Sequence, residues 1–245
     1  LAFLKHRESS PQPAGKITAH PSVNRPMSIA DPAARVAAAR MDAPGRAEQT
    51  PEEATMSSNH GTAQPEAPKP KVYIHVNHKQ ILGAIVGKYS LEKHSAHPEK
   101  FDVEFIEVRN QPFLHRKEGQ LYLRHGDKRR WLNNDLQSFT PLRFMPPELM
   151  GYRGRAVVTD PDVFAVGDVW ELLSRDMEGM ALLCRPKSGN KGKSGALASS
   201  VMLLDCAQLT HWRVEEQFNE MFTFQRDYMD WISLQLEDRS RIGLF

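Results

Sequence analysis

The stretch RAVVTDPDVFAVGDVWELL, residues 155–173, decides the fold. It opens with an apolar run rich in valine, which predicts a buried strand. Asp160 and Asp162 follow this strand, and Asp168 with Glu171 three residues later is the signature of a capped helix. A buried strand that runs through polar residues into a helix is typical of α/β proteins, which bind ligands at the carboxyl ends of their strands.

Further strands are predicted on both sides of this stretch. Each is a short apolar or alternating run: VYIHVN (72–77), FDVEFIEV (101–108), GMALLCRP (179–186) and SSVMLLDC (199–206). Because helical segments separate several of these runs, we expect an α/β domain whose sheet is mixed, mainly parallel and flanked by helices.

The helical segments vary in how clearly they are marked. Residues 140–151 begin with Thr-Pro and end with Gly, which are helix start and stop signals. The chain from Thr210 onward is predicted to be helical, and residues 111–134 are predicted to hold a hairpin that turns at Gly126-Asp127. The first helix carries apolar residues at the spacing of one helix face, namely Ile81, Leu82, Ile85, Val86 and Tyr89.

Composition narrows the class of protein. The 245 residues include 32 basic and 30 acidic side chains, so no basic excess favours nucleic acid as a partner. No apolar run reaches the roughly 18 residues of a membrane-spanning helix, and no transmembrane segment is expected. The two cysteines, Cys184 and Cys206, lie in apolar runs, which favours buried thiols in a cytoplasmic protein.

The chain divides near residue 70. Residues 1–70 hold ten of the seventeen prolines and a single aromatic residue, Phe3. A segment with so few large apolar groups cannot offset the entropy of ordering its backbone, so residues 1–70 are predicted to be a disordered tail. Residues 71–245 are predicted to form the folded domain.

Asp160 and Asp162 carry the clearest chemical signal. Two carboxylates just beyond a buried strand offer the hard oxygen ligands that Mn²⁺ or Mg²⁺ prefers, and such an ion can bridge to a substrate diphosphate. A solvated turn rich in Asp and Pro is the alternative interpretation of the same residues.

The central block, residues 138–173, resembles that of GT-A fold glycosyltransferases, particularly family 8 and its bacterial relatives. In both, an arginine-bearing helix precedes a strand, a D-x-D motif and a Gly-Asp helix cap. Residues 72–91 resemble the family's first strand and helix, FDVEFIEV its second strand, and residues 199–213 its later strand and tryptophan segment. The resemblance implies transfer of a sugar from a nucleotide-sugar donor, commonly a UDP-sugar, with retention of anomeric configuration.

The resemblance also implies roles for individual residues. Asp160 and Asp162 would hold the metal, and Arg143 would help to hold the donor. Asn77 and His78 would lie near the base or ribose, and Ser199-Ser200 stand where the family contacts the sugar. No side chain is identified as a catalytic nucleophile.

One expected feature of the family is not found. The resemblance implies a further histidine ligand well after the tryptophan segment, whereas the last histidine here, His211, lies within that segment. We therefore expect a domain that lacks its C-terminal part. The bacterial relatives suggest a glycan or lipid-linked acceptor and a position in the cytoplasm, peripheral to the inner membrane face.

Two other functions fit part of the pattern. A haloacid-dehalogenase-like phosphatase also places D-x-D after an apolar strand and would use Asp160 as its nucleophile. However, Val163-Phe164-Ala165 offers no hydroxyl group where that class carries one. A non-catalytic nucleotide-sugar-binding protein is the other alternative, and the missing histidine favours it.

Overall fold

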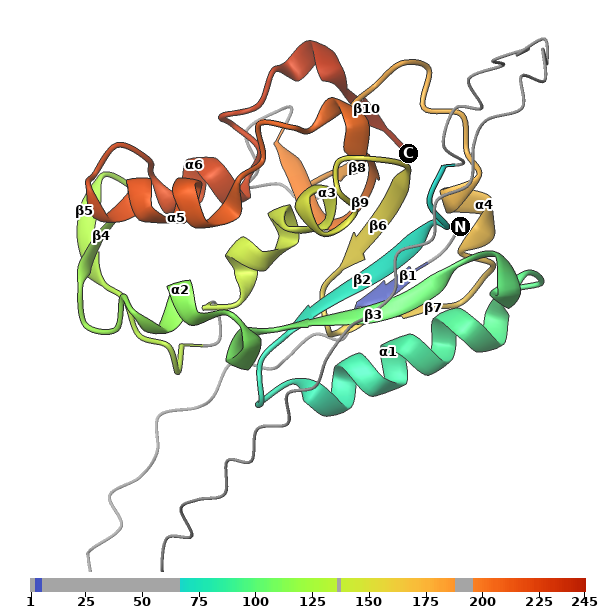
Figure 1. Cartoon of the computed structure of the whole chain (residues 1–245), viewed down its shortest axis with the longest axis horizontal. Helices are drawn as coiled ribbons and strands as arrows, with labels where there is room; N and C mark the ends of the chain where they lie inside the picture. The colour runs from blue at the N-terminus through green and yellow to red at the C-terminus, as the bar shows by residue number, and fades with distance from the viewer. Residues whose placement is uncertain (1–2, 6–66, 136–137, 188–195) are drawn as a thin grey trace, which may run out of the picture. The chain divides into compact units, whose positions relative to one another are not determined.

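A six-stranded sheet forms the centre of the computed structural model, which describes residues 3–5, 67–135, 138–187 and 196–245. Its order is β10-β8-β9-β6-β2-β3 (Figure 1). The strands are β2 (Lys71–Val76), β3 (Asp102–Glu107), β6 (Arg155–Thr159), β8 (Leu182–Pro186), β9 (Leu197–Asp205) and β10 (Ile242–Leu244).

The sheet is mixed and mainly parallel, as the sequence predicts. β2 runs parallel to both β3 and β6, and β10 runs parallel to β8. β9 is antiparallel to both of its neighbours, β6 and β8. All four strands predicted outside the central stretch are present within a few residues of their expected bounds.

Both faces of the sheet are buried because successive side chains of a strand point to opposite sides. On one face, Tyr73 and Val158 pack with η3 (Thr140–Phe144), α5 (Val214–Phe222) and α6 (Tyr228–Ile232). On the other face, Val72 and Val157 pack with α1 (Ile81–His94), β7 (Val163–Ala165) and α4 (Trp170–Leu173). Figure 1 shows α1 on the side of the sheet opposite to α5 and α6.

The orientation of α1 differs from what hydrophobic spacing suggests. Leu82, Ile85, Val86 and Tyr89 are exposed, whereas Ala84, Gly87, Ser90 and Leu91 face the core. Glycines allow the helix to approach the sheet closely, since a methyl group at Gly83 would lie 2.6 Å from the carbonyl oxygen of Pro161. Close backbone contact, rather than the size of the side chains, therefore decides which face of α1 packs against the sheet.

The predicted hairpin is present as β4 (Leu121–Arg124) and β5 (Asp127–Arg130). Its turn is one residue earlier than expected, at His125 and Gly126, whose φ angles of 55° and 76° are those of a tight hairpin turn. Tyr122 packs edge-on against Trp131 and Tyr228, which joins the hairpin to the C-terminal helices.

Shorter elements complete the connections. The predicted helix at 140–151 consists of the 3-10 helix η3 and α3 (Pro146–Leu149), and Gly151 follows with a φ of 59°. The segment from Thr210 is not one continuous helix, because it also contains η5 (Arg239–Arg241) and strand β10. The other short helices are η1 (Pro98–Lys100), η2 (Val108–Asn110), α2 (Pro112–His115) and η4 (Cys206–Gln208).

The region predicted as a tail contributes one short strand. β1 (Phe3–Lys5) pairs antiparallel with β7, and Phe3 lies opposite Ala165. Residues 6–66 of the predicted tail lie outside the described residues. Across the described segments, none of the helices combines the length and the apolar character needed to cross a bilayer. Cys184 and Cys206 are buried free thiols, as expected.

Candidate functional site

The chain changes direction across the sheet at β2. From β2 it passes through α1 to β3 on one side, and later returns to β6 on the other side of β2. The carboxyl ends of β2 and β6 therefore form a topological switch point, where open α/β sheets bind their ligands. Ile74 lies opposite Thr159 in this register, so His75 and Asp160 are neighbours at the switch point.

Asp160 is almost completely buried there, with 4% of its surface exposed. Its Oδ1 accepts a hydrogen bond from Arg143 Nε at 2.9 Å and forms an ion pair with Arg143 Nη2 at 2.6 Å. Its backbone N–H donates to the carbonyl oxygen of Ser200 at 3.0 Å, which ties β6 to β9. The charge of this carboxylate is thus balanced by a guanidinium group that is itself largely buried.

Arg143 also reaches the predicted sugar-contact position. Its Nη1 donates to Ser199 Oγ at 2.9 Å, and that hydroxyl donates to the backbone oxygen of Ile232 at 2.5 Å. Arg143 comes from η3, Asp160 from the end of β6 and Ser199 from β9. Three residues far apart in the sequence, each expected to contact the donor, therefore meet in one hydrogen-bonded group.

His75 lies beside this group, although the sequence did not identify it as a site residue. Its Nε2 lies 3.2 Å from Asp160 Oδ1, outside hydrogen-bonding geometry, and its ring centre lies 5.1 Å from that of Phe139. Complete burial lowers the pKa of His75, and Asp160 raises it only in part, so the imidazole is neutral. Its position as a polar residue inside the apolar run VYIHVN was the available signal.

Asp162 follows in a tight turn and is half-buried. The turn is closed by a hydrogen bond from Val163 N–H to the Asp160 carbonyl oxygen at 3.2 Å, and the first turn of α1 packs against it through Gly83. Together the turn presents two carboxylates, a donor set that suits Mg²⁺ or Mn²⁺ in kind. Within the described ranges no cluster of three or more His, Cys, Asp or Glu side chains is present.

A cavity of about 330 Å³ lies at the carboxyl ends of β2 and β3. Asn77 and His78, the residues expected near the base or ribose, both line it. The Asn77 side-chain oxygen accepts hydrogen bonds from the backbone of Lys79 and Gln80 at 3.0 and 3.2 Å, which shapes the turn into α1. Sequence reasoning did not identify its other polar lining residues, Glu107, Arg109, His115, Asn133 and Asn134.

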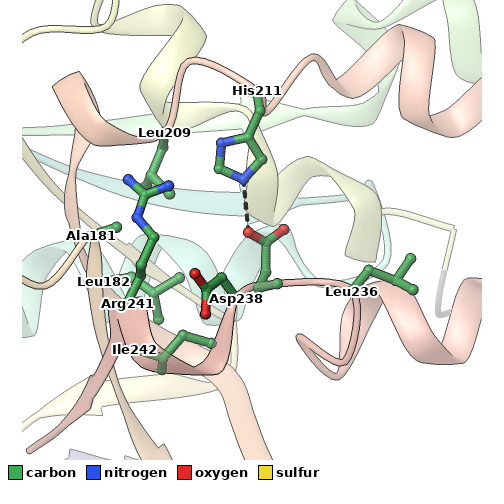
Figure 2. A pocket seen from close by; sticks show the side chains of 9 residues that line it. Ala181, Leu182, Leu209, His211, Leu236, Asp238, Arg241 and Ile242 are labelled. Atoms are coloured by element: carbon green, nitrogen blue, oxygen red, sulfur yellow. Dashed lines mark hydrogen bonds and ion pairs between the residues drawn. The ribbon is translucent and has the colours of Figure 1, made fainter.

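His211 lies in a separate cavity of about 250 Å³ beside the start of β8 (Figure 2). Its Nε2 is 2.8 Å from Glu237 Oε2, and Trp212 Nε1 donates to Glu237 Oε1 at 2.9 Å. Asp160, Asp162 and Arg143 are not among the residues that line this cavity. His211 is therefore engaged elsewhere in the fold.

Comparison with solved structures yields matches of low sequence identity. The chain is similar to the glycosyltransferase GlyE of Streptococcus pneumoniae, with 14% identity, a TM-score of 0.48, and coverage of 72% of this chain and 45% of GlyE. It is similar to the galactosyltransferase LgtC, also with 14% identity and a TM-score of 0.48, over 71% of this chain and 72% of LgtC. Mouse xyloside xylosyltransferase 1 matches with 13% identity and a TM-score of 0.45, over 72% of this chain and 84% of that one.

All three are glycosyltransferases. This is the class of enzyme that the sequence resemblance predicted. The chain spans less than half the length of GlyE. No protein-family model and no curated protein matches the sequence.

Proposed function

We propose that this chain transfers a sugar from a nucleotide-sugar donor, a UDP-sugar, to a glycan or lipid-linked acceptor. The observation that supports the proposal is the meeting of Asp160, Arg143 and Ser199 at the switch point of the sheet. The cavity lined by Asn77 and His78 lies along the same sheet edge, at the carboxyl ends of β2 and β3. A donor with a nucleoside at one end and a sugar at the other needs two such neighbouring regions.

In this proposal each region binds one part of the donor. The cavity beside Asn77 and His78 takes the nucleoside, and Ser199 and Ser200 lie toward the sugar. Arg143 provides a fixed positive charge where the diphosphate would accumulate negative charge as the leaving group departs. Because Asp160 and Ser199 hold its guanidinium, Arg143 needs little reorganisation during the reaction.

Asp160 and Asp162 would hold the divalent ion, Mn²⁺ or Mg²⁺. When bound, the ion would act as a Lewis acid that offsets the charge developing on the diphosphate. The carboxylates of the turn would provide the protein's share of the ligands, and the burial of Asp160 would keep water away from its side of the site.

We further propose that the reaction retains the anomeric configuration by front-face displacement. In that case the acceptor hydroxyl forms the new glycosidic bond, the bond to the diphosphate breaks, and the leaving phosphate takes up the hydroxyl proton. A phosphatase mechanism would instead require Asp160 to attack the substrate. Arg143 bound to Oδ1 lowers the nucleophilicity of that carboxylate, so this alternative is less well supported.

Calorimetric titration of UDP into the full chain, with and without Mn²⁺, tests the proposal. We expect UDP binding that requires Mn²⁺ and that weakens about tenfold or more in Asp162→Asn. Asp127→Asn, which removes an exposed carboxylate from β5, is the matched control and should bind as the wild type does. UDP binding that is indifferent to both Mn²⁺ and Asp162 would remove the D-x-D turn from the function.

Donor turnover then separates an enzyme from a binding protein. The wild-type chain should slowly hydrolyse at least one UDP-sugar in the presence of Mn²⁺, and Asp162→Asn should not. Tight UDP binding without turnover of any UDP-sugar, with or without acceptors, would favour the non-catalytic alternative.

A further inference from the structure

An apolar stripe runs along the solvent side of α1. It consists of Leu82, Ile85, Val86 and Tyr89, which are 76%, 49%, 52% and 58% exposed. These residues follow the i, i+3, i+4, i+7 spacing, so their side chains are contiguous along about two turns of helix. Contiguous exposed apolar residues mark interaction surfaces, whereas single ones are ordinary. We call these four residues the α1 stripe.

The α1 stripe points directly away from the core. At 100° per residue, it lies opposite the buried positions Ala84, Gly87 and Leu91. The inward face is held by close backbone contact, because a methyl group at Gly87 would lie 3.2 Å from the Val163 carbonyl oxygen. The helix therefore cannot rotate to bury the stripe without losing this packing.

Lysines lie near the stripe, together with the acidic residue Glu92. Lys93 lies at one end, with Nζ 5.4 Å from the centre of the Tyr89 ring. Lys88 flanks it, donating to the Val103 carbonyl oxygen at 3.0 Å and lying 3.6 Å from Glu92. Lys79 precedes the helix at the other end, and its Nζ donates to the carbonyl oxygen of Asn134 at 2.6 Å. An aliphatic centre with a tyrosine and snorkelling lysines at its margins is the composition of helices that lie in a membrane interface.

We infer that the α1 stripe docks on the headgroup region of an anionic lipid bilayer. Leu82, Ile85 and Val86 would enter the acyl boundary while the lysines contact lipid phosphates. A second copy of the chain fits less well, since four partly exposed side chains offer less than the ~800 Å² that each partner of a stable dimer buries. Docking on a bilayer requires no such minimum buried area.

The geometry places the candidate site beside this surface. The Asp160–Asp162 turn packs on the first turn of α1 at Gly83. The site therefore lies about 10 Å, one helix diameter, from a bilayer that contacts the stripe. This consequence rests on the proposed function, whereas the docking itself does not.

Vesicle flotation of the full chain tests the docking. We expect the wild type to float with vesicles of phosphatidylcholine and phosphatidylglycerol, to bind phosphatidylcholine alone much less, and to be released by high salt. Ile85→Ser/Tyr89→Ser should lose binding about tenfold or more. Leu121→Ser/Leu149→Ser removes apolar residues of similar exposure, 44% and 46%, and should float as the wild type does.

Three results would overturn the inference. These are a wild-type chain that does not float, an equal loss in the control variant, or light scattering that shows a dimer abolished by Ile85→Ser/Tyr89→Ser without vesicle binding. The last result would assign the stripe to a second copy of the chain. Circular dichroism of the stripe variant shows whether it has misfolded. UDP titration of the same variant tests the proposed function separately, because no stripe residue lines the cavity beside Asn77 and His78.

Discussion

Asp160 and Arg143 form an ion pair at a position where the fold excludes nearly all water. The side chains are 5% and 13% exposed, and the two nitrogen–oxygen distances to Oδ1 are 2.9 and 2.6 Å. His75 beside them is neutral because burial lowers its pKa. The guanidinium is thus the resident cation at this carboxylate, and in the proposed function a divalent ion at the turn would share Asp160 with it.

Removing the Arg143 guanidinium should show whether a metal ion can take its place beside Asp160. Arg143→Met keeps the side-chain volume but leaves a buried carboxylate without its main partner, which we expect to cost about 3 kcal/mol of unfolding free energy. Mn²⁺ should recover part of this loss and should stabilise the variant more than it stabilises the wild type. Urea unfolding with and without Mn²⁺ measures both effects.

The double variant Arg143→Met/Asp160→Asn is the control, because it also removes the uncompensated charge. It should be more stable than Arg143→Met alone and should not respond to Mn²⁺ more than the wild type does. Equal stability of the single and double variants would show that the ion pair contributes little.

At the residue scale, the fold brings together residues that the resemblance singled out, and their roles in binding stay predictions. Arg143, Asp160 and Ser199 were each expected to contact donor or metal, and the fold brings them together. His75 was missed because a polar residue within a buried strand is ordinarily a core residue. The lining residues Asn133 and Asn134 were missed because the loop that carries them has no periodicity to place it against β2.

Among the elements, the β4–β5 hairpin shows how one carboxylate can join two segments. Asp227 caps α6 by accepting a hydrogen bond from Met229 N–H at 2.7 Å, and it also accepts one from Gly126 N–H at 2.8 Å in the hairpin turn. Burial raises the pKa of Asp227, but backbone hydrogen bonds from Gly126, Met229 and neighbouring residues outweigh it, so the pKa is lowered.

The lowered pKa of Asp227 determines how its contribution to the stability of the fold depends on pH. A carboxylate whose folded pKa is depressed stabilises the fold above its unfolded pKa of about 3.9, and this contribution is lost as the pH falls through the folded pKa. Asp227→Ala should therefore cost about 1 kcal/mol at neutral pH, with a smaller difference from wild type below pH ~4. Urea unfolding across this pH range measures the difference.

Asp176→Ala is the matched control, since Asp176 is an exposed carboxylate that accepts one local backbone hydrogen bond from Glu178 N–H. A difference between Asp227→Ala and wild type that stays constant with pH would show that the capping contribution does not depend on charge.

The elements also show where pattern reading succeeds and where it stops. β6 and β9 have five and nine residues and are largely apolar, and both were predicted close to their observed bounds. β7 and β10 have three residues each, too few to show a period, and were missed. The exposed face of α1 went against hydrophobic spacing because Gly83 and Gly87 permit close contacts that outweigh side-chain bulk.

For the molecule as a whole, ligand binding should be visible as stabilisation of the fold. In the proposed function, Asp160 and Asp162 supply part of the ion's coordination and the donor diphosphate supplies more, so metal and donor should strengthen each other's binding. We expect Mn²⁺ and UDP together to raise the melting temperature by more than the sum of their separate effects. Thermal unfolding under the four combinations of the two ligands provides this measurement.

Asp162→Asn should remove the excess stabilisation while retaining the ordinary melting temperature of the unliganded chain. Strictly additive shifts in the wild type would mean that the two ligands bind independently.

The arrangement of strands around β2 also has a kinetic consequence. β2 pairs with β6, whose residues come 85 positions later in the chain, and Leu182 of β8 pairs with Ile242 of β10. Such contacts give the domain a high contact order. The chain must lose the conformational entropy of closing these long loops before the pairings form, which slows folding. Refolding from denaturant is therefore expected on a scale of roughly milliseconds to seconds, with the local β4–β5 hairpin and α1 able to form well before the sheet closes.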